Sequence, residues 1–173
     1  MSPHRPRRSV DQIKATYEDT LHALRRRFEQ LEKSVAQFVP DLDQQALTAA
    51  WNSDDPGERN RADGVLSSFE KTHMLLMDLI ALSVKLARRI EAIDDESTPA
   101  PELLVNAGVI SREDIVAIEK QREVRNTSQH IYIQLSMSAL RLAVLQQIET
   151  TPSTIRNVAA WVESLEPGAE VDT

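Results

Sequence analysis

The stretch that decides the fold is residues 66–90, LSSFEKTHMLLMDLIALSVKLARRI. Its mostly apolar side chains recur every three or four residues, which is the spacing of one face of an α-helix. Four further apolar residues lie off this face, so the middle of the helix is apolar on two faces. We expect the second face to be covered by another copy of the chain or, alternatively, by the last helix or a short helix at 41–52. The main face comprises Leu66, Phe69, His73, Leu76, Ile80, Ser83, Ala87 and Ile90, and the residues off it are Leu75, Met77, Leu79 and Leu82.

Further amphipathic segments flank this helix on both sides. Their apolar residues keep the same helical spacing, and residues that favour turns or helix ends separate them. The pattern therefore predicts helices throughout the chain. The expected elements are a helix at 10–38 stopped by Pro40, a short helix at 41–52, a turn at 53–57, a helix at 62–93, a helical turn at 102–106 stopped by Gly108, a helix opened by Ser111, a helix at 133–148 ended by 150–152, and a last helix at 153–165.

Length and composition favour one all-α domain. The chain has 173 residues, of which 41% are apolar, and this suits a single domain, 1–173, with one core. Four Gly and 4% aromatic residues, without separated β-branched runs, favour helices over strands. We expect residues 1–9 and 167–173 to be flexible ends.

Charge and cysteine content narrow the function. The net charge of -7 has the wrong sign for a protein that attracts nucleic acid over its whole surface, so RNA would need a local basic site such as Lys120, Arg122 and Arg125. The chain has no Cys, which excludes disulfides and thiolate chemistry. No apolar run approaches the roughly 18 residues of a membrane span, and the N-terminus lacks the apolar part of a signal peptide. We therefore expect a cytoplasmic protein that does not bind membranes.

Residues 125–132, RNTSQHIY, bring three chemically capable side chains into one short segment. Arg125 carries a permanent positive charge, His130 titrates near neutral pH, and Tyr132 adds a phenol. Residues 126–128 are three consecutive poor helix formers, so we expect a bend or helix junction there. An unbroken helix would point Arg125 and His130 about 140° apart, whereas a break would let them converge.

Arginine and histidine together suit the cleavage of RNA. Arginine cannot act as a base, but its planar guanidinium matches a phosphate and the charge that develops on it. Histidine can accept or donate a proton near pH 7. The pair fits a reaction in which the ribose 2′-hydroxyl attacks the neighbouring phosphodiester, which only RNA permits. One histidine per chain supplies one proton-transfer group, so a two-fold dimer would supply both the base and the acid.

The spacing of Arg125, His130 and Tyr132, with Asn126 directly after the arginine, resembles the R-x4-6-H motif of HEPN domains. The R-x4-H-x-Y form is similar to that of HepT-like toxins. Residues 103–110 also resemble the stretch that precedes the motif in that family, and the overall resemblance covers about 66–165. The chain departs from the family by having Thr-Ser-Gln inside the motif, where aliphatic residues are usual.

This resemblance implies an antiparallel up-and-down bundle of four to five helices that forms a homodimer with the motif at the interface. It implies a metal-independent endoribonuclease without a cofactor, in which Arg125 and His130 are catalytic and Asn126 supports the site. It also implies the toxin half of a toxin–antitoxin pair. A nucleotidyltransferase antitoxin would adenylylate Tyr132, and the added charge and bulk would block the RNA site.

Other interpretations of the same residues remain open. The 125–132 segment could be structural, with a surface arginine and a core or capping histidine. His73 is expected to be a core residue with satisfied hydrogen bonds, whereas His22 is expected to be exposed. Asp19 with His22, and Glu70 with His73, partly match a di-iron bundle, although such a site also needs carboxylates from two further helices. A different class of function is a catalytically silent HEPN-like subunit that binds a nucleotidyltransferase or a nucleotide as a scaffold.

Overall fold

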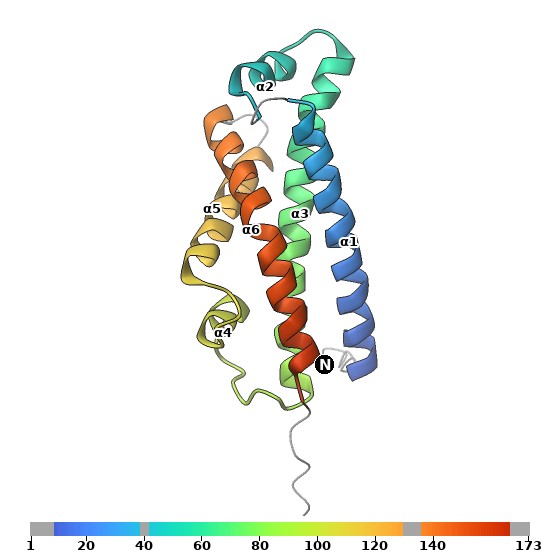
Figure 1. Cartoon of the computed structure of the whole chain (residues 1–173), viewed down its shortest axis with the longest axis vertical. Coiled ribbons are helices and arrows are strands. Elements are labelled where there is room, and N and C mark those ends of the chain that lie inside the picture. Colours follow the sequence, from blue (N-terminus) through green and yellow to red (C-terminus); the bar gives the residue numbers. More distant parts are fainter. Residues whose placement is uncertain (1–8, 39–41, 130–135, 167–173) are drawn as a thin grey trace, which may run out of the picture.

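The computed structural model describes residues 9–38, 42–129 and 136–166, and these ranges form a bundle of six α-helices without strands. The all-α class expected from the sequence is therefore confirmed. Figure 1 shows α1, α3 and α6 running along the long axis, with α2 at one end and α4 and α5 stacked along one side. The helices are α1 (Val10–Ala36), α2 (Gln44–Trp51), α3 (Pro56–Arg89), α4 (Ala100–Asn106), α5 (Arg112–Gln129) and α6 (Met137–Ser164).

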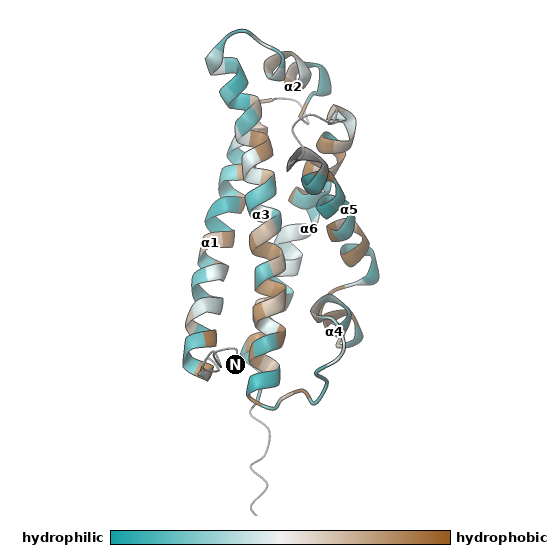
Figure 2. Cartoon of the chain, turned by 180° about the vertical axis from the view of Figure 1, so that it is seen from behind, coloured by the Kyte–Doolittle hydropathy of each residue, from teal (hydrophilic) through white to brown (hydrophobic). Residues whose placement is uncertain are grey.

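Helix α3 is the central element of the bundle, since it contacts all five of the other helices. Its apolar residues off the main face are covered by helices of the same chain: Leu79 is fully buried, and Leu75 and Leu82 pack against the core. Met74 is an exposed large apolar residue of α3, with 43% of its surface accessible. Figure 2 shows the hydrophobic colouring concentrated along α3, whereas α1 is largely hydrophilic on the face in view. The alternative of cover from within the chain therefore accounts for this apolar surface, and α3 does not need a second copy to bury it.

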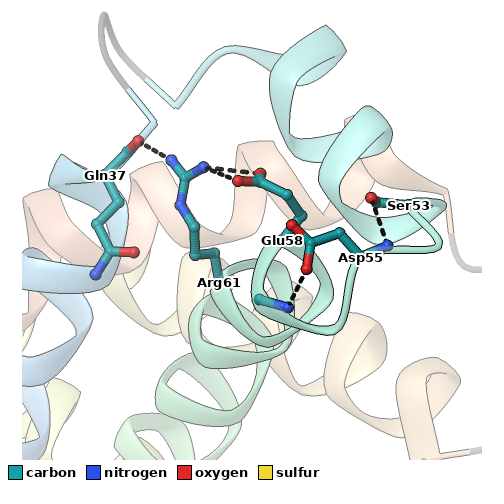
Figure 3. Close-up of polar contacts among 6 residues, drawn as sticks. Gln37, Ser53, Asp55, Glu58 and Arg61 are labelled. Atoms are coloured by element: carbon teal, nitrogen blue, oxygen red, sulfur yellow. Dashed lines mark hydrogen bonds and ion pairs between the residues drawn. The ribbon is translucent and has the colours of Figure 1, made fainter.

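The start of α3 is tied to the end of α1. Asp55 caps α3 by accepting a hydrogen bond from the Gly57 N–H at 2.9 Å, and Pro56 occupies the first turn. Arg61 pairs with Glu58 at 2.8 Å and donates to the Gln37 carbonyl at 2.7 Å, as Figure 3 shows. The expected turn at 53–57 was thus partly wrong: Asp-Pro acts as a cap followed by a first helical residue, so α3 begins at Pro56 rather than near position 62.

Helix α6 continues through Pro152, so the expected boundary at 150–152 was wrong. Proline removes one backbone donor and normally kinks a helix. Here the apolar stripe stays in phase on both sides of it, since Val144, Ile155 and Val158 are all buried. Side-chain hydroxyls also occupy nearby carbonyls: Thr154 donates to the Thr150 carbonyl at 3.0 Å. Packing of one continuous stripe outweighs the single lost hydrogen bond.

The start of α5 agrees with the expectation from the sequence, whereas its C-terminal part does not. Its start is as expected: Gly108 adopts a φ of 70°, and the Ser111 hydroxyl accepts from the Asp114 N–H at 3.0 Å. Its backbone then remains helical through 126–128, where a bend was expected, and reaches Gln129. The expected bend is wrong at 126–128, but the expected junction between two helices is confirmed a few residues later, since α5 ends at Gln129 and α6 begins at Met137.

The core of the bundle has two apolar clusters that lie at successive heights along α3. One contains Phe69 of α3 with residues of α1, α2 and α6, and the other contains Leu76 and Leu79 of α3 with residues of α1, α4, α5 and α6. Within the described ranges, no helix combines the length and the apolar content that crossing a bilayer would require.

Candidate functional site

The end of α5 carries the described part of the predicted site. Arg125 is half-buried and Asn126 is exposed, and both lie in the C-terminal part of α5. His130 and Tyr132, the other two predicted site residues, lie outside the described residues. The structure therefore places Arg125 and Asn126 at the end of a helix that packs against α6, directly before the rest of the motif.

Arg125 lies on the inward face of α5. Ile118 and Gln121, which precede it by seven and four residues, lie on the same side of the helix, and both are buried. Val116 lies on the opposite side and is 41% exposed. The guanidinium of Arg125 therefore extends from the line of α5 that meets the core, whereas Asn126 faces solvent.

Next to this arginine lies a layer of buried polar side chains, which we call the polar layer and define as Thr72, His73, Gln121, Gln147 and Thr151. All five residues are fully buried, at 0% exposure. They come from α3, α5 and α6, and along each of these helices they fall between the residues of the two apolar clusters. The core is thus interrupted at mid-height by polar groups from three helices.

The hydrogen bonds of the polar layer are few and long. The Gln147 amide donates to the Phe69 carbonyl at 3.3 Å and to the Gln121 side-chain oxygen at 3.4 Å. Within the described part of the chain, six further polar atoms of the layer have no hydrogen-bond partner. A buried polar atom without a partner costs about 1–3 kcal/mol, so this layer is an expensive feature of the core. The six atoms are Thr72 Oγ1, both ring nitrogens of His73, Gln121 Nε2, Gln147 Oε1 and Thr151 Oγ1.

His73 is kept neutral by its surroundings. Burial is the main cause that lowers its pKa from 6.5 to about 4, and the charges of Arg125 and Arg122 lower it further. The Gln121 side chain acts in the opposite direction because it favours the protonated ring. The expectation that His73 is a core residue is confirmed. The expectation of satisfied hydrogen bonds is wrong, since among the described residues neither ring nitrogen has a partner of acceptable geometry.

The electrostatic influence of Arg125 on His73 connects the two parts of the site. A charge lowers the pKa of an imidazole only when it lies close enough to be poorly screened. Arg125 lies one turn beyond Gln121 of the polar layer on the same face of α5, and its charge, like that of Arg122, lowers the pKa of His73. Between positions 120 and 126 the three cations Lys120, Arg122 and Arg125 outnumber the one carboxylate, Glu123, so this end of α5 is locally basic in a chain of net charge -7.

Two residues of the polar layer, Gln121 and Gln147, were not predicted from the sequence to be site residues. A signal for Gln121 was present, because it follows Ile115 and Ile118 on the apolar line of α5 where another apolar residue would be expected. Gln147 gave a similar signal beside Val144 on α6. The heights at which the three helices meet carry no local signature in the sequence, so the layer itself could not be predicted.

The di-iron arrangement does not assemble in the described ranges. Asp19 and His22 are exposed on α1, whereas His73 is fully buried on α3. Within those ranges, no three side chains of the kinds that bind metals come together.

A groove of about 510 Å³ lies between α1 and α6. Its floor is apolar and includes Phe28 and Ile155, and charged residues of both signs line it. The charged residues are Arg25, Glu29, Arg156 and Glu163. All four of these charged residues are exposed.

No family model, curated protein or solved structure matches the chain.

Proposed function

We propose that this protein is a HEPN-type endoribonuclease that acts as a homodimer and cleaves RNA with Arg125 and His130. The observation that carries the proposal is the position of Arg125. It is a half-buried arginine on the inward face of α5, one turn beyond the buried Gln121, and it immediately precedes the remainder of an R-x4-H-x-Y motif. The locally basic end of α5 also supports the proposal, because an acidic protein needs such a place to bind phosphate.

In the proposed reaction, the ribose 2′-hydroxyl attacks the adjacent phosphorus. His130 of one subunit accepts the hydroxyl proton, and the His130 of the second copy gives a proton to the departing 5′-oxygen. The products are a 2′,3′-cyclic phosphate and a free 5′-hydroxyl, so atoms and charge balance without an added water. Arg125 stabilises the negative charge that develops on the phosphate oxygens. Asn126 supports the site by helping to hold the RNA backbone.

The proposed control of this activity acts at Tyr132. A nucleotidyltransferase antitoxin would transfer AMP from ATP to the phenol oxygen and release pyrophosphate. The attached group adds a phosphodiester charge and an adenosine beside Arg125, which would repel and exclude RNA. On this proposal the protein is the toxin half of a toxin–antitoxin pair.

Substitution of the two catalytic residues tests the proposal. We expect Arg125→Ala and His130→Ala each to reduce RNA cleavage by about 100-fold or more, since a proton-transfer group or a phosphate-binding cation commonly contributes that much. Arg59→Ala is the matched control, because it removes the same charge from an exposed position on α3, away from the basic end of α5. Cleavage by Arg125→Ala and His130→Ala at the parent rate would show that the assignment is wrong.

A second candidate is a catalytically silent HEPN-like subunit that binds a nucleotidyltransferase or a nucleotide. The half-buried position of Arg125 favours it, since a structural arginine would also occupy such a place. Purified protein that leaves RNA intact and still binds the partner enzyme would support this candidate over the first.

A further inference from the structure

The contact between Gln121 and Gln147 links the polar layer to the helix that carries Arg125. Gln147 of α6 donates through one amide nitrogen to the Phe69 carbonyl of α3 and to Gln121 of α5. One fully buried side chain thus bridges all three helices at a single height. The Gln121 side chain also acts on His73 of α3, where it opposes the lowering of the His73 pKa.

Arg125 lies one helical turn beyond Gln121 on the same face. Side chains four residues apart are neighbours on a helix, with their Cβ atoms about 5–6 Å apart. Any rotation or sliding of α5 that moves Gln121 therefore moves Arg125 by a similar amount. A slip of one turn would displace the guanidinium by about 5.4 Å, which is more than a catalytic contact tolerates.

Apolar contacts alone would hold α5 in place less specifically. Ile115 and Ile118 could pack against α3 and α6 at more than one height, because apolar contacts have no preferred direction. A buried polar contact is directional, and misplacing it leaves additional buried groups unpaired. Buried polar residues that fix the register of helices at a cost in stability are well documented in coiled coils.

We infer that Gln121 and Gln147 are positioning residues that fix the height and rotation of α5 against α3 and α6, and thereby place Arg125 for RNA cleavage. The functional half of this inference rests on the proposed ribonuclease activity. The structural half, that the pair sets the register of α5, can be measured without any RNA.

The variant that tests both halves is Gln121→Leu with Gln147→Leu. Leucine replaces each glutamine with an apolar side chain of similar volume, so the fold is expected to persist and its melting temperature to stay level or rise. We expect kcat for RNA cleavage to fall by about 10-fold or more with KM little changed, since the substrate still binds but Arg125 is misplaced. A residue with a merely structural role would give the opposite result, in which activity follows stability. Tyr17→Phe is the control, because it removes a buried hydroxyl without a described partner from α1, outside the polar layer.

A distance measurement decides the structural half. The chain has no Cys, so spin labels can be placed uniquely through Lys71→Cys on α3 and Glu119→Cys on α5, both exposed positions. We expect one narrow distance distribution for the otherwise unaltered chain and a broadened or shifted one for the double leucine variant.

The outcomes separate the two ideas. An unchanged distribution in the leucine variant overturns the positioning inference whatever the activity. If the leucine variant has an altered distance distribution but retains Arg125-dependent cleavage, the functional half of the inference is wrong. Absence of Arg125-dependent cleavage in the parent chain overturns the proposed function and the functional half with it, while the distance measurement still decides whether the pair sets the register.

Discussion

The interface between α1 and α3 and the interface among α3, α5 and α6 are built on different principles. The first is largely apolar, with fully buried leucines such as Leu24 and Leu31, and Arg61 ties its end together by pairing with Glu58 and the Gln37 carbonyl. The second contains the polar layer, where most of the buried side-chain atoms without a described partner are found. The first interface stabilises the fold, whereas the second contains unpaired polar groups that destabilise it, next to the helix that carries Arg125. Concentration of such costs at one place is typical of functional regions.

Truncation of the apolar interface should give the largest effect. We expect Leu31→Ala to lower the free energy of unfolding by about 2–5 kcal/mol, because it removes buried methyl groups and leaves a cavity. Leu31 is 0% exposed, whereas Leu142 is 57% exposed on α6, so Leu142→Ala makes the same chemical change on the surface. Denaturant unfolding of both variants measures the contrast, and equal losses would show that the apolar interface is not the main source of stability.

Lowering the pH should weaken the second interface through His73. Its pKa falls from 6.5 in the unfolded chain to about 4 in the folded one, so the unfolded chain binds more protons between these values. The stabilisation from the neutral ring is therefore complete above pH 6.5 and is lost as the pH falls toward 4. The full change is on the order of 3 kcal/mol, since one pKa unit corresponds to about 1.4 kcal/mol.

The variant His73→Leu isolates this contribution. It should remove the His73 part of the pH dependence and should raise stability at pH 7, because two unpaired ring nitrogens are removed from the core. The pKa of Asp95 is lowered to about 2, mainly by hydrogen bonds from Thr98 and Ser97. Carboxylates such as this one are the same in the parent chain and in His73→Leu, so their contribution cancels in the comparison. Unfolding measured from pH 7 to pH 4 in the two chains gives the difference, and parallel curves would contradict the role of His73.

Pro152 offers a smaller effect within α6. Alanine at this position restores a backbone N–H to a continuous helix, and we expect Pro152→Ala to raise the free energy of unfolding by about 1–2 kcal/mol after the greater freedom of the unfolded chain is allowed for. The melting temperature measures the gain. A loss of stability would mean that the proline ring is needed where it lines the groove between α1 and α6.

Local signals in the sequence predicted the helices well and their junctions less well. Gly108 and Ser111 were recognisable because a left-handed residue and an N-cap each act within one turn. Pro152 was misleading because a local breaker was overruled by packing along the whole length of α6. The inward position of Arg125 was not predicted, and its influence on His73 depends on how α3 and α5 meet, which no single segment encodes.

Removal of the Tyr17 hydroxyl should give the smallest change in the free energy of unfolding, and it tests the comparison on α1, outside the polar layer. Burial is the main cause that raises its pKa to about 12, with the charge of Glu163 adding to it, and its hydroxyl has no hydrogen-bond partner in the described residues. Since phenylalanine keeps the ring and removes only this hydroxyl, we expect Tyr17→Phe to change the free energy of unfolding by less than about 1 kcal/mol, toward greater stability. Thermal unfolding at pH 7 measures it. A clear loss of stability would show that the hydroxyl is paired in solution, and the contrast between the two interfaces would then lie in the number of unpaired groups alone.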